Sequence, residues 1–308
     1  MAATKGEFAL INWIRRQSTF GKNVIVGIGD DAAALRPPKN GAVLLTTDTI
    51  LEGVHFNFKT VTPFQAGWKA IASAVSDIAA MGGVPEYAVV AVVLPKDASM
   101  KFARRLYEGM RSVADRCGVA IVGGDVTSWR GKLAVNVSVF GKVDGRPITR
   151  LGAKVGDAIF VTGDLGGSVR ERHVEFLPRT REALALRKAV RLHAMIDVSD
   201  GLAADLRHIV EESGVGAILY EEAIPVSRDA EILARRGGKS AVEHALGDGE
   251  DFELLFTVSN RDAGRLLSGP PFRTRLSRIG EITARGFYIK KKTGGRVRLN
   301  PSGYEHFK

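Results

Sequence analysis

One pattern recurs along this chain: a short apolar run leads directly into an aspartate flanked by small residues. Its first copy is Val24–Val26, typical of a buried strand, which continues through Gly27–Gly29 into Asp30 and Asp31. Carboxylates beside a buried strand are costly unless something compensates their charge. A hairpin turn explains a single copy equally well, since Gly and Asp are ordinary turn residues. The recurrence of the pattern favours a site.

Other carboxylates lie beside small residues at the predicted ends of strands or helices: Asp48, Asp77, Asp125, Asp197, Asp200, Glu250 and Asp251. Strand ends in layered α/β structures are where ligand sites collect. Two like charges ~4 Å apart repel by roughly 4 kcal/mol at an effective dielectric near 20, so a cluster needs protons or cations. Because these candidate ligands are hard oxygens, Mg²⁺ is favoured over zinc. Clustered aspartates with glycine-rich turns therefore indicate phosphate chemistry.

Three of these aspartates differ in whether local structure alone explains their presence. Asp77 falls in the last turn of a predicted helix, where the helix dipole disfavours an acid. A bound cation explains it best, and an exposed, screened Asp is the alternative. Ser199 or Asp200 can cap the next predicted helix, so capping alone explains Asp200. Asp197 ends an apolar strand and has no such explanation.

Length and composition bound the fold. The 308 residues, 45 % of them hydrophobic, suffice for one large or two medium-sized domains. No apolar run approaches the ~20 residues that span a bilayer, and the N-terminus predicts an amphipathic helix with Phe8, Ile11 and Ile14 on one face rather than a signal peptide. Cys117 is the only cysteine, which excludes an internal disulfide and fits a packing role in a reducing cytoplasm. We therefore expect a soluble cytoplasmic protein without a membrane partner.

The net charge of +10 suits anionic partners such as nucleotides or nucleic acid. A generally basic proteome or a solubility effect is the alternative. Basic residues are scattered, apart from Lys290–Lys292, and aromatic residues are not interleaved with them. Nucleic-acid binding is therefore the weaker option.

The hydrophobic periodicity predicts alternating strands and helices. Strands are expected at 24–26, 42–48, 54–58, 87–94, 120–122, 133–143, 158–162, 195–198, 217–220 and 252–258, and helices at 62–81, 99–116, 181–192 and 202–212. Two short helices up to residue 246 and a β-rich tail complete the prediction. Residues 144–157 are rich in glycine and basic residues and lack core periodicity, so we place the domain boundary there.

Familiar nucleotide-binding signatures are absent from the sequence. Residues 237–240 imitate the end of a P-loop, but Leu233 stands where a glycine is required. Gly163–Ser168 is either an anion cradle made of backbone amides or a plain loop. His55, which follows the Thr46–Asp48 motif, either lines the same site or is structural.

Seven stretches, in this order, resemble the thiamine-monophosphate kinases of the aminoimidazole-ribonucleotide-synthetase-like superfamily. They are GIGDDAA (27–33), TTDTILEGVHF (46–56), KAIASAVSDIAAMGGVP (69–85), GGDVT (123–127), VTGDLGGS (161–168), IDVSDGLAADL (196–206) and GEDFELLFTV (249–258). Each is weak alone, but together they are specific and span most of the chain.

The resemblance implies an α+β protein of two domains: an N-terminal α+β domain (1–148) that dimerises through its sheet, and a C-terminal α/β domain (149–308). It implies ATP-dependent phosphorylation of thiamine monophosphate by a homodimer, with several Mg²⁺ ions. The implied metal ligands are Asp31, Thr46, Thr47, Asp48, Asp77, Asp125, Asp197 and Asp200. The implied ATP contacts are Tyr107, Gly124, Asp125, Arg150 and Ser199, and the implied substrate contacts are His55, Glu250 and Tyr304. No general base or covalent nucleophile is expected.

The chain departs from the family pattern after VTGDLGGS, where the charged stretch 169–194 replaces the helix of small residues that the family pattern predicts. Within this stretch, Arg179 is the residue expected to take the place of an arginine of the family pattern. Two alternatives stay open: an aminoimidazole ribonucleotide synthetase-type ligase, and a non-catalytic nucleotide-binding regulator with the same fold. Selenophosphate synthetases carry a reactive Cys or selenocysteine near the N-terminus, and this sequence has none there. Hydrogenase-maturation relatives end in Cys, whereas this chain ends in His306–Lys308.

Overall fold

The structure, a computed structural model, describes residues 13–26, 34–35, 40–170 and 172–300. The chain divides into two compact units. Unit 1 holds the described residues up to Ile78 together with Gly83–Arg146 and Val174–Pro178, and unit 2 holds Ala79–Gly82, Pro147–His173 and the described residues from Arg179 onward. Of the predicted site residues, Asp31 and Tyr304 lie outside the described residues, as do Asp30, Phe8 and Ile11.

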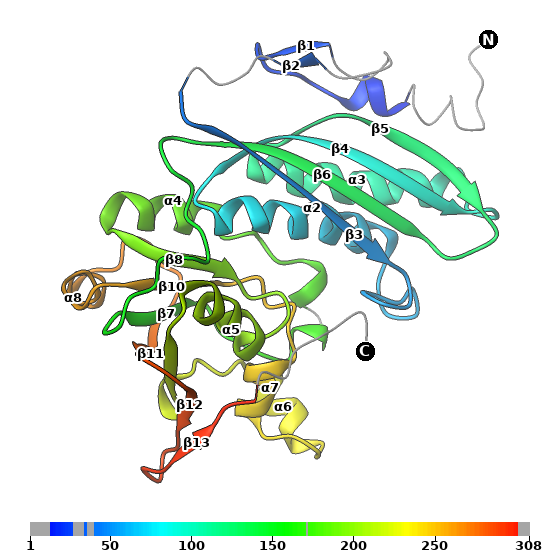
Figure 1. Ribbon diagram of the computed structural model, residues 1–308. Helices are drawn as coiled ribbons and strands as arrows, with labels where there is room; N and C mark the ends of the chain where they lie inside the picture. Colours follow the sequence, from blue (N-terminus) through cyan, green and yellow to red (C-terminus); the bar gives the residue numbers. More distant parts are fainter. Residues whose placement is uncertain (1–12, 27–33, 36–39, 171, 301–308) are drawn as a thin grey trace, which may run out of the picture. The chain divides into compact units, whose positions relative to one another are not determined.

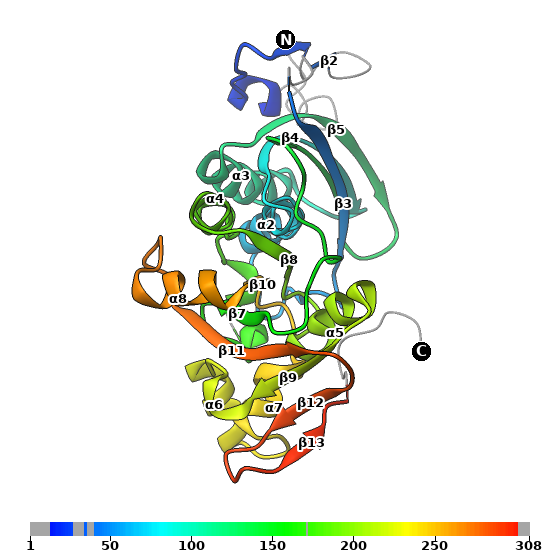
Figure 2. The same ribbon diagram turned by 60° about the vertical axis from the view of Figure 1, so that its left-hand side comes forward.

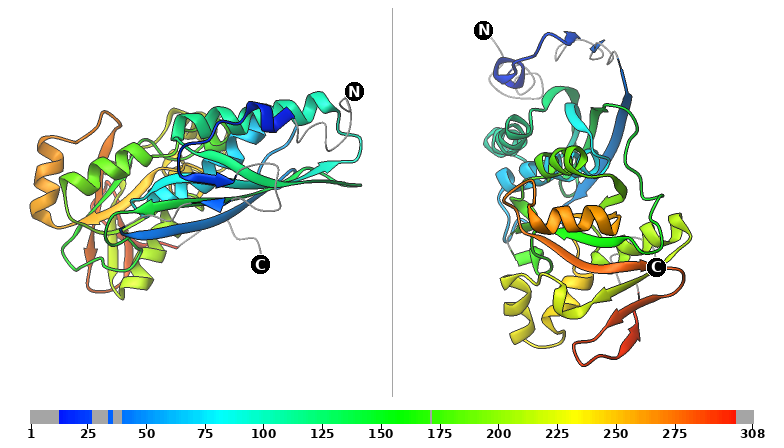
Figure 3. Two further views of the ribbon diagram at one scale, coloured as in Figure 1. Left: turned by 90° about the horizontal axis from the view of Figure 1, so that it is seen from above. Right: turned by 90° about the vertical axis from the view of Figure 1, so that its left-hand side faces the viewer.

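Unit 1 is built on a four-stranded sheet covered on one face by two helices (Figures 1 and 3). The sheet order is β3 (Ala42–Leu51), β6 (Ala134–Val143), β4 (Val84–Pro95) and β5 (Ala120–Trp129). Only the β4–β5 pair is parallel. The covering helices are α2 (Pro63–Ala80) and α3 (Met100–Cys117). A separate two-stranded sheet pairs β1 (Val24–Val26) with β2 (Ala34–Leu35) antiparallel.

The two faces of the four-stranded sheet differ in burial. On the inner face, which packs against the helices, Leu44 and Ile50 of β3 are in register with Gly141 and Val135 of β6, and all are buried. The outer face bears exposed apolar side chains of β3, including Leu45. Strand alternation separates these two sets, so each residue of β3 is assigned to a face by its position.

Unit 2 is built on a mixed seven-stranded sheet (Figure 2). Its order is β13 (Arg296–Arg298), β12 (Phe287–Lys290), β9 (Gly216–Tyr220), β11 (Leu276–Thr283), β7 (Ala158–Thr162), β10 (Leu254–Val258) and β8 (Leu192–Asp197). The β12–β9 pair is parallel and the other pairs are antiparallel. Every residue of β7 and β10 is buried, which places the core on both faces of these central strands.

Helices cover both faces of this sheet. Helices α5 (Leu202–Ser213) and α7 (Ala241–Gly247) contribute to the apolar cluster that contains Ile159 and Val161 of β7. Helices α4 (Thr180–Ala189) and α8 (Asn260–Ser268) contribute to the opposite cluster, with Phe160 and Phe256. The remaining elements are α6 (Arg228–Arg235) and the 3₁₀ turns η1 (Ser168–Arg170), η2 (Arg172–Val174) and η3 (Glu221–Ala223).

Several sequence predictions need correction. Residues 54–58 do not form a strand: β3 ends at Leu51, Gly53 takes a φ of +89° in the turn that follows, and Phe56 makes only an isolated bridge with Glu52. The β-rich tail contains a helix, α8, that begins at the N-cap Ser259. Strands β3 and β5 continue past Asp48 and Asp125; the prediction that these aspartates end strands is wrong. Among the described residues, no helix combines the length and apolarity required to cross a membrane.

Candidate active site

On the inner face of the unit 1 sheet, the edge strand β3 carries two polar residues among apolar ones. Thr46 and Asp48 are in register with Val139 and Val137, which are both buried. Thr46 Oγ1 donates a hydrogen bond of 2.5 Å to Asp77 Oδ2, in the last turn of α2. The fold therefore brings these two predicted ligands into contact and places Asp48 on the same face of β3.

Thr47 and Asp125 lie on the outer face of that sheet. Asn136 Nδ2 of β6 is 3.1 Å from Thr47 Oγ1. Asp125 of β5 is in register with Ala91, which is in register with Asn136, so Asp125 shares the outer face. Strands β3 and β5 are the two edges of the sheet. Within one chain, the sheet separates Asp125 from the contact between Thr46 and Asp77.

His55 lies in the turn that follows β3. Its Nδ1 accepts the backbone N–H of Leu51 at 3.0 Å, and its carbonyl accepts Lys69 Nζ of α2 at 2.8 Å. Because Nδ1 is an acceptor, the neutral imidazole carries its proton on Nε2. This Nε2–H group is a donor that a phosphate oxygen can accept. Lys69 is only 1 % exposed. No sequence pattern indicated a role for Lys69, since it lies within an otherwise apolar helical stripe.

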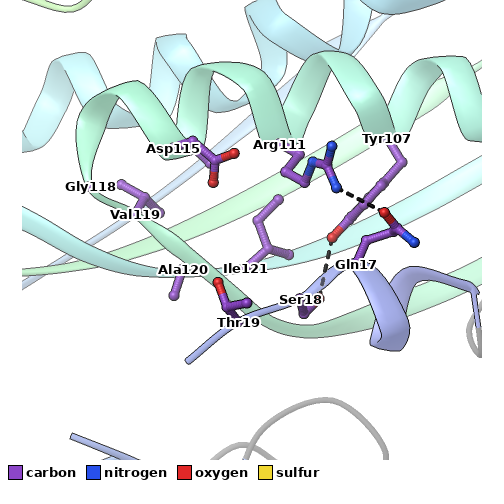
Figure 4. A pocket seen from close by; sticks show the side chains of 11 residues that line it. Gln17, Ser18, Thr19, Tyr107, Arg111, Asp115, Gly118, Val119, Ala120 and Ile121 are labelled. Atoms are coloured by element: carbon purple, nitrogen blue, oxygen red, sulfur yellow. Dashed lines mark hydrogen bonds between the residues drawn. The ribbon is translucent and has the colours of Figure 1, made fainter. Parts of the chain in front are cut away.

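Tyr107 lines a pocket of about 250 Å³ in unit 1 (Figure 4). The pocket lies between residues 17–19, the last turns of α3, and the start of β5. The Tyr107 hydroxyl is 3.4 Å from Ser18 Oγ, and Arg111 Nη1 donates to Gln17 Oε1 at 3.1 Å. Burial raises the pKa of Tyr107. Sites for drug-sized ligands occupy roughly 300–1,000 Å³, so this pocket suits a single ring system rather than a whole nucleotide.

Gly124 immediately precedes Asp125 in β5. A Cβ at this position would lie 2.0 Å from the carbonyl oxygen of Val90 in the neighbouring strand, so only glycine fits.

In unit 2, two stretches far apart in the sequence, 197–200 and 249–253, lie against each other. The backbone N–H of Glu250 donates to Ser199 O at 2.7 Å, and that of Phe252 donates to Val198 O at 2.8 Å. A Cβ on Gly249 would lie 2.6 Å from Ser199 O, so the close approach requires glycine. The predicted residues Asp197, Ser199, Asp200 and Glu250 are therefore gathered at the end of β8.

The turn after β8 is held by a residue that the sequence analysis did not identify. Asp205 Oδ2 accepts the backbone N–H groups of Asp200 and Gly201, both at 3.1 Å. Gly201 is the N-cap of α5 and provides no side-chain cap; the prediction that Ser199 or Asp200 caps the helix is wrong. Asp200 is thus left without a capping role.

This turn carries concentrated negative charge. Burial raises the pKa of Asp205 well above its ordinary value, and the nearby carboxylates of Asp197 and Asp200 raise it further. Ligand atoms of Asp200, Asp205 and His208 all lie within 4.8 Å of one another. The set offers two carboxylates and one imidazole to a cation.

Four backbone amides of the glycine-rich loop 163–168 are occupied within the protein. Gly163 N donates to Arg275 O, Leu165 N to Pro225 O, Gly166 N to the Asp251 carboxylate, and Gly167 N to Asp248 Oδ2. These donors are used within the protein. The loop alternative of the sequence analysis therefore fits the structure better than the anion cradle.

Arg179 and Arg150 differ in their surroundings. Arg179 makes a bidentate ion pair with the buried Glu253, with distances of 2.7 Å from Nε and 2.5 Å from Nη2. Hydrogen bonding and charge from Glu253 raise the pKa of Arg179 although burial opposes the shift. Arg150 is exposed, and its carbonyl accepts Ser213 Oγ at the far end of α5 from Asp200.

Two family models match the chain: the AIR synthase related protein N-terminal domain over residues 29–143, and the corresponding C-terminal domain over residues 154–291. The thiamine-monophosphate kinase of Rhodopirellula baltica is 37 % identical over 310 residues, which cover 97 % of each chain. The chain belongs to the thiamine-monophosphate kinase family.

Solved structures of this family share the fold. The thiamine-monophosphate kinase from Stenotrophomonas maltophilia K279a is 36 % identical, with a TM-score of 0.81 over 92 % of this chain and 96 % of that one. AaThiL complexed with AMPPCP and TMP is 30 % identical, with a TM-score of 0.76 over 98 % of this chain and 97 % of that one. The two-domain α+β architecture of the family is therefore also that of this chain.

Proposed function

We propose that this chain transfers the γ-phosphoryl group of ATP to thiamine monophosphate, giving thiamine diphosphate and ADP. The observation that carries the proposal is the nearly end-to-end likeness to AaThiL, which was solved with AMPPCP and TMP. The oxygen donors of both units support it, because phosphoryl transfer depends on charge neutralisation and positioning.

The residues fit Mg²⁺, a hard cation that prefers oxygen ligands. In unit 1, Thr46, Asp48 and Asp77 would hold ions on the inner side of β3, while Thr47 and Asp125 offer oxygens on the outer side. In unit 2, Asp197 and Asp200 would hold ions, with Asp205 and His208 beside them. Asp31 is proposed by its motif alone. Bound Mg²⁺ neutralises charge on the phosphates.

The chemistry needs no general base, because the nucleophile is a phosphate oxygen that is already anionic. That oxygen forms a bond to the γ-phosphorus while the bond from the γ-phosphorus to the β–γ bridging oxygen breaks, and ADP leaves. His55 donates from Nε2 to the phosphate of thiamine monophosphate, and Glu250 and Tyr304 contact the same substrate. The residues act by orientation and electrostatic stabilisation.

The nucleotide is assigned to Tyr107, Gly124, Asp125, Arg150 and Ser199. The pocket beside Tyr107 has room for one ring system rather than a whole nucleotide, so the base would enter it. We also propose a homodimer formed through the outer face of the unit 1 sheet, which exposes Leu45 and Val43. Apolar side chains gathered on a sheet face are typical of an interface.

A paired assay tests this function. Purified protein with ATP and Mg²⁺ is expected to convert thiamine monophosphate to the diphosphate, measured by chromatography of both thiamine species. Turnover of formylglycinamidine ribonucleotide instead would support an aminoimidazole ribonucleotide synthetase-type ligase. ATP binding without turnover of either substrate would support a non-catalytic regulator.

A further inference from the structure

The segment 249–253 has an unusual backbone. Glu250 and Phe252 have φ angles of 54° and 50°, and no other non-glycine residue in the described part of the chain has a positive φ. The left-handed region is unfavourable for residues with a Cβ, so surrounding contacts must hold it in place. Strained backbone of this kind clusters at functional sites.

On one side, the segment is fixed by backbone hydrogen bonds. Glu250 and Phe252 donate to the turn after β8, at Ser199 O and Val198 O, and Glu253 O accepts Val198 N at 2.8 Å. These bonds connect the segment to the turn that carries Asp197 and Asp200.

On the other side, the residue between the two strained positions provides the contacts. Both carboxylate oxygens of Asp251 accept the Gly166 N–H at 2.9 Å, Ser168 Oγ donates to Oδ1, and Arg172 Nη2 lies 3.2 Å from Oδ1. The Asp251 side chain is completely buried. Ser168 Oγ also lies 3.1 Å from Gly249 O, so the loop 163–168 contacts the segment at both Gly249 and Asp251.

We propose that Asp251 is a positioning residue that, through Gly166, Ser168 and Arg172, holds Glu250 in its left-handed conformation against the turn after β8. The proposal rests on the proposed function in one respect, namely that Glu250 contacts the thiamine phosphate. Asp251 itself touches no substrate, because its carboxylate is buried among protein donors. Arg172 belongs to the charged stretch 169–194, so that stretch also supports the substrate site.

A double-mutant cycle separates positioning from general structural support. Asp251→Ala is expected to raise the KM for thiamine monophosphate about tenfold, with the KM for ATP nearly unchanged, because one substrate contact is misplaced. In a Glu250→Gln background, the same change should raise that KM by less than about twofold. Asp251→Asn, which keeps one acceptor oxygen, should restore part of the loss. If the two substitutions raise the KM for thiamine monophosphate independently, so that the increase in the double variant is the product of the two single increases, the proposal is overturned.

Amide hydrogen exchange provides a readout that needs no turnover. Asp251→Ala should accelerate exchange at Glu250 and Phe252, whereas Asp262→Asn, at a buried aspartate in the first turn of α8, should not. If Asp251→Ala does not fold, Ser168→Ala removes one donor and tests the same two amides. Unchanged exchange in folded variants would overturn the proposal. Absence of thiamine monophosphate turnover by the wild-type protein would count against the proposed function, and the exchange result would still decide the role of Asp251.

Discussion

Asp77 lies in the last turn of α2, where the helix dipole is negative, and the hydroxyl of Thr46 donates to its carboxylate. Asp77→Asn keeps an acceptor oxygen for that hydroxyl and removes the charge. We expect the free energy of unfolding to stay equal or rise by up to about 1 kcal/mol. The rate of phosphoryl transfer should fall at least ~100-fold, because charge neutralisation at the phosphates is lost. Urea denaturation and steady-state kinetics measure the two effects.

Glu212→Gln is the matched control for Asp77→Asn. Glu212 is an exposed acid in the last turn of α5, so its neutralisation should shift stability in the same direction and leave turnover intact. A variant of Asp77 that loses stability and turnover together would show that this carboxylate is structural.

Asp251 makes stability depend on pH. Burial raises its pKa to about 7, although hydrogen bonds from Ser168 and Gly166 and the charge of Arg172 oppose the shift. In the unfolded chain the pKa is about 3.9, so between pH ~4 and ~7 the folded state binds the proton more tightly. The contribution of this group therefore decreases as pH rises through that window. Relative to Asp251→Asn, the wild-type protein should lose stability between pH 5 and pH 8 in urea titrations. A constant difference would contradict this.

At the scale of elements, local signals predicted most of the fold. The helix α3 begins after the N-cap Ser99 and ends at Gly118, which has a φ of 72°, as the sequence indicated. The strand at 158–162 was also predicted at its observed bounds. The prediction failed where alternation continued through polar residues, as at Asp48 and Asp125, and where a helix as short as α8 followed a strand directly.

The candidate site was predictable in composition but not in arrangement. The motifs named Asp197, Ser199, Asp200 and Glu250, yet only the long-range hydrogen bond from Glu250 N to Ser199 O shows that they meet. Asp205 carried no distinguishing signal, since it acts through backbone amides whose positions depend on the tertiary fold. Asp251 was named as a carboxylate beside Glu250, but its contacts with Gly166, Ser168 and Arg172 are set by the tertiary fold.

The crossing of α2 and α3 depends on two glycines. A Cβ on Gly109 would lie 1.9 Å from Phe64 O, and one on Gly67 would lie 2.0 Å from Leu106 O. Gly109→Ala must therefore push the helices apart, and we expect a loss of about 1–3 kcal/mol in the free energy of unfolding. Because α2 positions Asp77 against Thr46, the Mg²⁺ concentration that gives half-maximal activity should rise as well.

Gly264→Ala is the control for this helix substitution. Gly264 lies in α8, and a Cβ added to it would have no neighbouring atom within 4 Å, so alanine should stabilise the protein by about 0.5–1 kcal/mol. Equal effects of the two substitutions in urea denaturation would mean that the helix crossing does not require glycine.

At the scale of the whole molecule, a homodimer would account for the positions of Thr47 and Asp125. These residues lie on the outer face of the unit 1 sheet, at its two opposite edge strands. Three strand spacings of about 4.8 Å separate the edges by roughly 14 Å, too far for one ion to join both residues within a chain. A second copy that covers this face can bring its own edge strand close to the edge of the first.

Leu45→Glu tests this arrangement, because Leu45 is 65 % exposed on the outer face and a charge buried in an interface is costly. Sedimentation velocity should show the wild-type protein as a dimer and the variant as a monomer. Since Thr47 and Asp125 would then lack their counterparts from the second copy, the monomer should lose ATP-dependent turnover while its thermal unfolding stays cooperative. Val297→Glu, at an exposed position of β13 in unit 2, should change neither property. A Leu45→Glu monomer with full activity would show that each chain contains a complete site, and Asp125 would then have no part in binding the ions held by β3.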